Sequence, residues 1–298
     1  MESIPVLILF VITMAANLTG NMVRNYYSKS VSSTMAGYHL FNAATSLVCG
    51  VTLILLSGGN FSLSPFTLAL AILFGAVTAT QQVATSAALN IGPCSYTSVI
   101  ISMSTVITAL SGALFFGESL RVNQLIGIAM MLGCLALSVK KDDEEKKRTV
   151  RWYGCCLVGC ICSAGVGLMQ KIHQGSDFRG ELTMFLIIAF VCSFVFSSVS
   201  LMLEKKKSGG NAALFDRQAG MMLLLALFIA GGVGVALNNQ INLYLSGVVD
   251  SAVFFPIVNG GGLILITVAS VILFRERLTG KQWIGLALGI AATLLLCI

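Results

Sequence analysis

The chain has 298 residues, of which 56% are hydrophobic and only 10% are charged. Soluble domains carry roughly 25% charged residues, so this composition excludes a water-soluble fold of this size. The net charge of +6 does not indicate a nucleic-acid partner, because the basic residues fall between apolar segments, as in membrane proteins.

Ten apolar segments follow one another along the chain. A helix crosses a bilayer with roughly 20 apolar residues, and lipid tolerates no unpaired backbone, so each segment is predicted to be helical. The first segment has no small-residue cleavage site and is predicted to be a span, not a signal peptide. The fold class is therefore all-α integral membrane. The ten predicted transmembrane helices are 4–24, 34–57, 66–90, 94–116, 122–139, 152–171, 181–203, 218–245, 250–273 and 281–297.

Basic residues are concentrated in alternate loops, at 24–29, 140–151, 205–217 and 275–281. The opposite loops carry only Arg121, Lys171 and Arg179. The positive-inside rule places the basic set in the cytoplasm. With an even number of spans, both termini then face outward from a plasma or inner membrane.

The two halves of the chain resemble each other at a constant offset. We predict a first five-helix repeat at 1–139, a charged linker loop at 140–151 and a second five-helix repeat at 152–298. Five spans is an odd number, so the second repeat is inverted, an arrangement typical of alternating-access transporters. The matching residues are Phe116, Glu118, Leu120, Gln124, Ile126 and Gly127 with Phe274, Glu276, Leu278, Gln282, Ile284 and Gly285, and Gln82 with Gln240.

The turns 117–120 and 275–278 carry a resemblance to a known family. Gly117-Glu118-Ser119-Leu120 and Arg275-Glu276-Arg277-Leu278 resemble the turn that closes the fourth helix of each repeat in the drug/metabolite transporter superfamily, EamA type. The resemblance covers essentially the whole chain. It implies secondary transport, often efflux of amino acids or other metabolites, through a cavity lined by both repeats. It also implies cytoplasmic termini, in conflict with the charge count.

Amide and hydroxyl side chains lie inside several spans. An unpaired amide in hydrocarbon is costly, so such residues face partners or a cavity. The alternative is ordinary helix packing, which applies most to the serines of the fourth span and to the glycines after Pro256 in the ninth. The candidate substrate-binding residues are Asn17, Asn21, Gln81, Gln82, Ser98, Ser102, Asn238, Asn239 and Asn259.

Three basic residues are candidate charge contacts with a substrate. Arg24 and Lys171 close counterpart spans of the two repeats, and His39 enters the second span, where it could carry a coupling proton. The alternative is that these side chains reach the lipid headgroups. No Asp or Glu lies in the middle of a predicted span. A neutral, amide-rich cavity with basic groups favours a zwitterionic or anionic, amino-acid-like substrate over a lipophilic cation.

The sequence lacks the motifs that would indicate an enzyme, a metalloprotein or an ATP-driven transporter. An enzyme would need a nucleophile and a base at membrane depth. The chain has only two histidines that could serve as the base, His39 and His173, and the latter is in a predicted loop. The cysteines at 155, 156, 160 and 162 match no zinc spacing, and no metal or other cofactor is predicted. No ATP-binding motif occurs. We predict a secondary transporter of a small polar metabolite, acting as a monomer or weak dimer. A multidrug or cation exporter and a non-transporting channel or scaffold remain alternatives.

Overall fold

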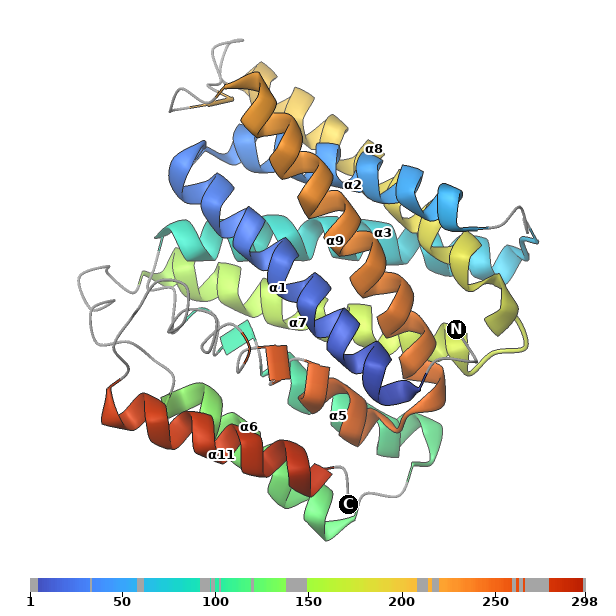
Figure 1. The fold of residues 1–298 in the computed structure, drawn as a ribbon. Helices are drawn as coiled ribbons and strands as arrows, with labels where there is room; N and C mark the ends of the chain where they lie inside the picture. Colours follow the sequence, from blue (N-terminus) through green and yellow to red (C-terminus); the bar gives the residue numbers. More distant parts are fainter. Residues whose placement is uncertain are drawn as a thin grey trace.

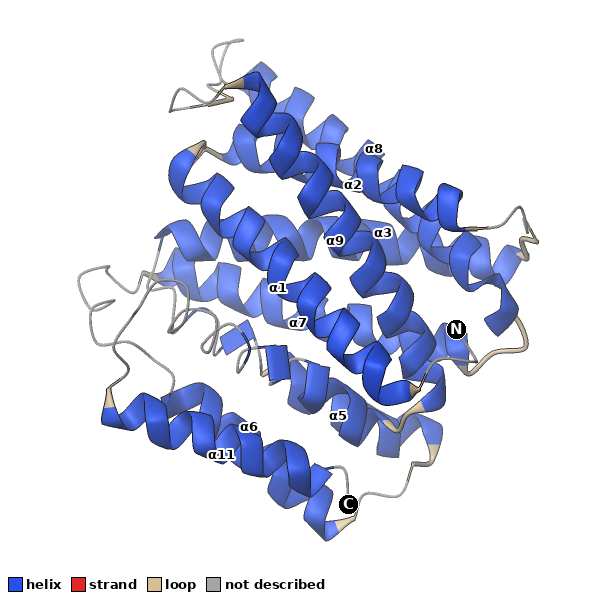
Figure 2. Cartoon of the chain, in the orientation of Figure 1, coloured by secondary structure: helices blue, strands red, loops and turns tan. Residues whose placement is uncertain are grey.

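The computed structural model describes residues 5–32, 34–57, 62–91, 97, 100–101, 103–118, 121–137, 149–207, 214–215, 220–258, 261–262, 265 and 279–296. All regular structure in these ranges is helical (Figure 2). A one-turn 3-10 helix, η2, spans Arg179–Glu181, and residues 251–258 are also helical. The α-helices are α1 Val6–Ser30, α2 Met35–Leu56, α3 Pro65–Ile91, α5 Ser104–Phe116, α6 Val122–Leu137, α7 Val150–Gln174, α8 Leu182–Lys207, α9 Met221–Val248 and α11 Gly280–Leu296.

Within the described residues, six helices are long and apolar enough to cross a membrane, namely α1, α2, α3, α7, α8 and α9. The segments Ser104–Phe116, Val122–Cys134 and Trp283–Ala292 are shorter apolar helices. The chain is therefore a multi-pass membrane protein, as its composition predicts. Most helix ends lie within a few residues of the predicted spans.

Two helices extend beyond their predicted ends. Helix α1 continues past Arg24 to Ser30, so Arg24 lies inside the helix rather than at its end. Helix α7 continues to Gln174, so the prediction that His173 lies in a loop is wrong: it is fully buried in the last helical turn. Its ring packs against Phe185 of α8, with the ring centroids 4.5 Å apart, and this contact favours helix over loop.

The fourth predicted span is not one regular helix. Residues 100–101 are helical, Met103 lies in a turn, and α5 begins at Ser104. The backbone N–H of Met103 donates to the carbonyl of Ile100 (3.2 Å), and that of Val106 donates to the carbonyl of Met103 (3.1 Å). These bonds between residues three apart tighten the backbone relative to an α-helix.

Helices of the first half pack against helices of the second half (Figure 1). α1 lies along α9, α2 along α8, α3 along α7 and α8, and α6 along α11. The sequence offset predicts that α1 corresponds to α7 and α3 to α9. The symmetry that relates the two repeats would then map the pair α1–α9 onto the pair α7–α3, and both pairs are in contact. This pattern supports the predicted repeat, which stays a prediction.

Close helix contact in a membrane requires small residues, because lipid tails give apolar side chains no reason to cluster. At the crossing of α1 and α9, a Cβ on Gly234 would lie 3.2 Å from the Ala16 carbonyl oxygen and 3.4 Å from the Gly20 nitrogen. The two backbones therefore meet almost directly. This contact brings the polar faces of α1 and α9 together.

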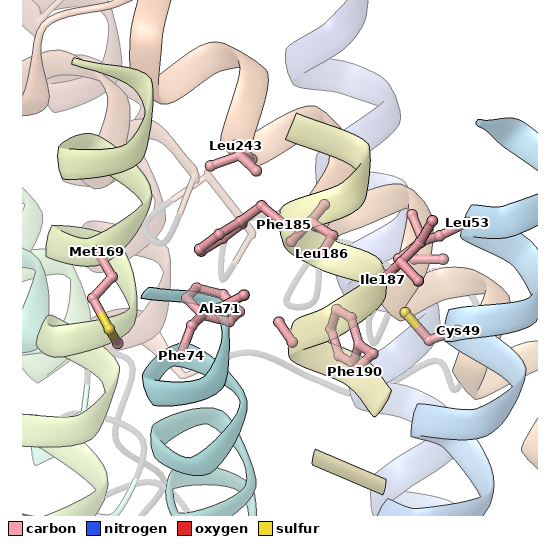
Figure 3. Packing of buried hydrophobic residues seen from close by; sticks show 12 residues of the cluster. Cys49, Leu53, Ala71, Phe74, Met169, Phe185, Leu186, Ile187, Phe190 and Leu243 are labelled. Carbon is pink, nitrogen blue, oxygen red and sulfur yellow. The ribbon is translucent and has the colours of Figure 1, made fainter. Parts of the chain in front are cut away.

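An apolar cluster joins α2, α3, α7, α8 and α9 (Figure 3). At its centre the rings of Phe74 and Phe185 meet edge to face, with centroids 5.1 Å apart, and both side chains are fully buried. Cys49 and Leu53 of α2 pack at one side of the cluster and Met169 of α7 at the other. Van der Waals contact in this cluster stabilises the packing of these five helices against one another.

Two polar pairs join α2 to α8. The Asn42 side-chain amide donates to the Ser197 hydroxyl at 2.7 Å, and the hydroxyls of Ser46 and Ser193 are 3.1 Å apart. All four side chains are buried. Such pairs satisfy polar groups that could not face lipid and fix the register of the two helices.

Candidate functional site

A cavity of about 220 Å³ lies between α1, α3, α5, α7, α9 and the helical residues 251–258. Both halves of the chain therefore contribute to its wall. The wall is polar, although α1, α3, α7 and α9 around it are long and apolar enough to cross a membrane. The amide and charged side chains that line it are Asn17, Asn21, Arg24, Gln81, Gln82, Gln170, Asn238, Asn239 and Asn242.

Arg24 provides positive charge to the cavity. Its Nη2 donates to the Oε1 of Gln82 on α3 at 2.7 Å, and Gln82 is buried. A charged donor makes this hydrogen bond stronger than one between neutral groups. Of the lining residues that the structure describes, none is an Asp or Glu. Gln82 thus orients the guanidinium without neutralising it.

A hydrogen-bond network fixes the amides of α9. The buried Thr13 hydroxyl on α1 lies 2.8 Å from the Oδ1 of Asn242 and 3.1 Å from the Oδ1 of Asn238. The Nδ2 of Asn242 also donates to the Oδ1 of Asn238 at 3.3 Å. The Asn238 oxygen is therefore engaged within the protein.

Two further amides bind within their own helices. Asn21 donates from its Nδ2 to the Oδ1 of Asn17, one turn earlier on α1. Asn239 donates from its Nδ2 to the backbone carbonyl of Val235 at 2.9 Å. The oxygens of Asn17, Gln82 and Asn238 all accept protein donors, so the hydrogen-bonding groups these three residues can still offer are mainly amide N–H groups.

The structure brings six of the nine candidate binding residues to one cavity: Asn17, Asn21, Gln81, Gln82, Asn238 and Asn239. The other three, Ser98, Ser102 and Asn259, lie outside the described residues. Sequence reasoning missed Ser104, Thr108, Ser163 and Gln170, which also line the cavity. The rule that polar residues in spans face partners or a cavity would have selected Gln170, which lies in an apolar helix and is buried.

The candidate charge contacts divide. Arg24 lines the cavity, whereas Lys171 and His39 are not among its lining residues. Lys171 lies one turn beyond Gly167 on α7 and forms an ion pair with Glu118, with Nζ and Oε1 2.6 Å apart. His39 is buried in α2 and interacts electrostatically with Glu204 of α8.

Comparison with known proteins identifies the family. The sequence matches the model of the Triose-phosphate Transporter family over residues 6–297. The chain belongs to this family. The family is a member of the drug/metabolite transporter superfamily, so the predicted superfamily is confirmed. No curated protein matches the sequence.

The Triose-phosphate Transporter family is one of membrane transporters, which agrees with the predicted class of function. Solved structures show the same fold. One, described only as a crystal structure of a protein, superposes with a TM-score of 0.75 over 97% of this chain and 98% of that chain, at 14% sequence identity. A likeness at this identity concerns the fold alone.

Proposed function

We propose that this member of the Triose-phosphate Transporter family is a secondary transporter that moves a small organic anion through the cavity by alternating access. The observation that carries the proposal is the Arg24 guanidinium, held by Gln82 in a cavity whose described lining has no carboxylate. A guanidinium presents several N–H donors in a plane and suits phosphate or carboxylate groups.

The family suggests which anion. Its transporters are of the sugar-phosphate and nucleotide-sugar type. The cavity of about 220 Å³ is smaller than the ~300–1,000 Å³ of drug-sized sites, which favours a sugar phosphate over the larger nucleotide sugar. The amide N–H groups of Asn17 and Asn238 are suited to phosphate and hydroxyl oxygens.

An amino-acid-like zwitterion is the second candidate. Its carboxylate could bind Arg24 in the same way, but its ammonium group would need acceptors. The oxygens of Asn17, Gln82 and Asn238 already accept hydrogen bonds from the protein. The Arg24 charge, with no carboxylate among the described lining residues to balance it, therefore favours an anion over a zwitterion, and disfavours the cation exporter for the same reason.

Alternating access rests on the helix pairing across the two halves. Because α1 packs on α9 and α3 on α7, the cavity lies where the halves meet. Rocking one half against the other would then change which side of the membrane the cavity faces. A non-transporting scaffold would have no need for a polar cavity at this interface.

A thermal-stability screen of the purified protein tests the substrate class. The panel holds sugar phosphates, amino acids, nucleotides and quaternary amines, each at several concentrations. A ligand at 100 times its Kd stabilises the folded state by about 2.7 kcal/mol. We expect sugar phosphates to raise the melting temperature. Stabilisation by amino acids or amines instead, without sugar phosphates, would overturn the proposed anion.

A further inference from the structure

Glu118 and Lys171 lie at the centre of a polar cluster at one end of the cavity. Their Oε1 and Nζ atoms are 2.6 Å apart, and the side chains are only 12% and 13% exposed. Glu118 also accepts from the backbone N–H of Ser251 at 2.8 Å, and Lys171 donates to the carbonyl of Val249 at 3.2 Å. The cluster joins the end of α5, the end of α7 and the start of the helical residues 251–258.

The turn at the end of α5 positions the Glu118 carboxylate. Gly117 ends α5 in the left-handed conformation (φ 66°), which glycine adopts without steric cost, and the backbone N–H of Glu118 closes on the Gly112 carbonyl at 3.2 Å. The carboxylate then accepts from the backbone N–H and the hydroxyl of Ser251, at the start of a helix, where negative charge is favoured. The ion pair is thus one part of a network that also includes hydrogen bonds to Ser251 and Val249.

Between this cluster and the cavity, three helical elements are in close contact. A Cβ on Gly112 would lie 2.6 Å from the Ser251 Cβ, and one on Gly167 would lie 2.7 Å from the Phe255 ring. Thr108, next to Gly167, is buried although it lines the cavity. At the opposite end the lining includes Asn21, which is exposed. The cavity is therefore closed at the Lys171 end.

The ion pair also spans the two halves of the chain. Glu118 belongs to the first half, whereas Lys171, Val249 and Ser251 belong to the second. Any rocking of one half against the other at this end must separate the carboxylate from Lys171 and Ser251. Because the cost of removing two charges from water offsets much of their attraction, such a pair adds little net stability, which suits a contact that forms in one state and breaks in the other.

We propose that Glu118 and Lys171 form a latch that holds the cavity closed at the Lys171 end and opens when the halves move. The proposal rests on the alternating access put forward above, since a protein without two states has no use for a latch. Neither residue lines the cavity, so neither is a substrate contact in this state.

Cysteine labelling in substrate-free proteoliposomes tests the latch. The reporter is Ser163→Cys, at a half-buried residue that lines the cavity, in a background without the native cysteines. A membrane-impermeant maleimide is applied from either side. In the otherwise unchanged protein, labelling from the Lys171 side should be at least about ten times slower than from the Arg24 side. Equal rates from the two sides overturn the proposal.

The latch variants remove the ion pair from each partner in turn. Glu118→Gln and Lys171→Gln should each speed labelling from the Lys171 side by about tenfold or more, as expected for loss of a charged hydrogen bond. Lys171→Arg keeps the charge and should leave labelling slow. Arg179→Gln, which removes an exposed positive charge in the adjacent turn, is the matched control and should change nothing.

The outcomes separate the latch from the proposed substrate. Unchanged labelling in both glutamine variants refutes the latch, whatever the protein transports. Faster labelling supports the latch even if no sugar phosphate stabilises the protein, in which case only the substrate assignment fails. Should one glutamine variant fail to fold, judged by its elution and circular dichroism, the other variant and the two-sided comparison still decide.

Discussion

Replacing Arg24 by glutamine removes the charge that the proposed substrate requires while keeping a polar, although shorter, side chain. The guanidinium has five N–H donors, and the bond to Gln82 uses one of them. A hydrogen bond to a charged group contributes about 1.5–3 kcal/mol, and 1.4 kcal/mol corresponds to a factor of ten. We therefore expect Arg24→Gln to weaken the binding of a sugar phosphate by roughly 10–100-fold, measured as Kd by titration calorimetry.

The controls separate charge from position. Arg151→Gln removes an exposed positive charge at the start of α7, outside the cavity, and should leave Kd unchanged. Gln82→Ala keeps the Arg24 charge but loses its partner, so we expect a smaller loss, of about tenfold or less. If Arg24→Gln binds the sugar phosphate within about twofold of the unchanged protein, the guanidinium is not the anion site and the reasoning from cavity charge is wrong.

Two further predictions concern stability, measured by thermal unfolding in detergent. Gly167→Ala should destabilise the protein by about 1–3 kcal/mol, because the new Cβ would lie 2.7 Å from the Phe255 ring, whereas Gly154→Ala on the same helix meets no atom within 4 Å and should be tolerated. If the two alanines destabilise the protein equally, the close contact between α7 and the helical residues 251–258 is refuted. In a double-mutant cycle, alanine at Asn42 and at Ser197 should reveal a coupling of about 0.6–1.7 kcal/mol, from the 2.7 Å hydrogen bond between them. A coupling indistinguishable from zero would remove this bond from the account of how α2 and α8 associate.

The helices and one face of the site follow from local sequence patterns. Apolar runs of the right length predict the spans, and the 3.6-residue period places Thr13, Asn17 and Arg24 on one side of α1. The rule that amides avoid lipid then selects Gln82 and Asn238. The structure brings Asn17, Arg24, Gln82 and Asn238 to one cavity, and the Thr13 hydroxyl lies against Asn238.

Which polar residues share a partner depends on packing that no local pattern encodes. Gln240 matches Gln82 in the sequence offset, yet its Nε2 donates to the Thr183 hydroxyl on α8 at 3.0 Å. Lys171 and Arg24 look equivalent in sequence, but one binds Glu118 and the other Gln82. The acceptor in each case comes from a different helix, and only the arrangement of helices decides which one is in reach.

The contact between Thr13 and Asn242 joins positions 229 residues apart in the chain. A ribosome adding ~5–20 residues per second makes α9 roughly 10–50 s after α1. During that interval α1 has entered the membrane with a polar stripe whose α9 partners do not yet exist. Gln82, 58 residues after Arg24, arrives first and can shield the most costly group of that stripe. Until α9 is made, the growing chain therefore has only part of the cavity lining. Chains truncated before α9 lack the side of the cavity that α9 provides.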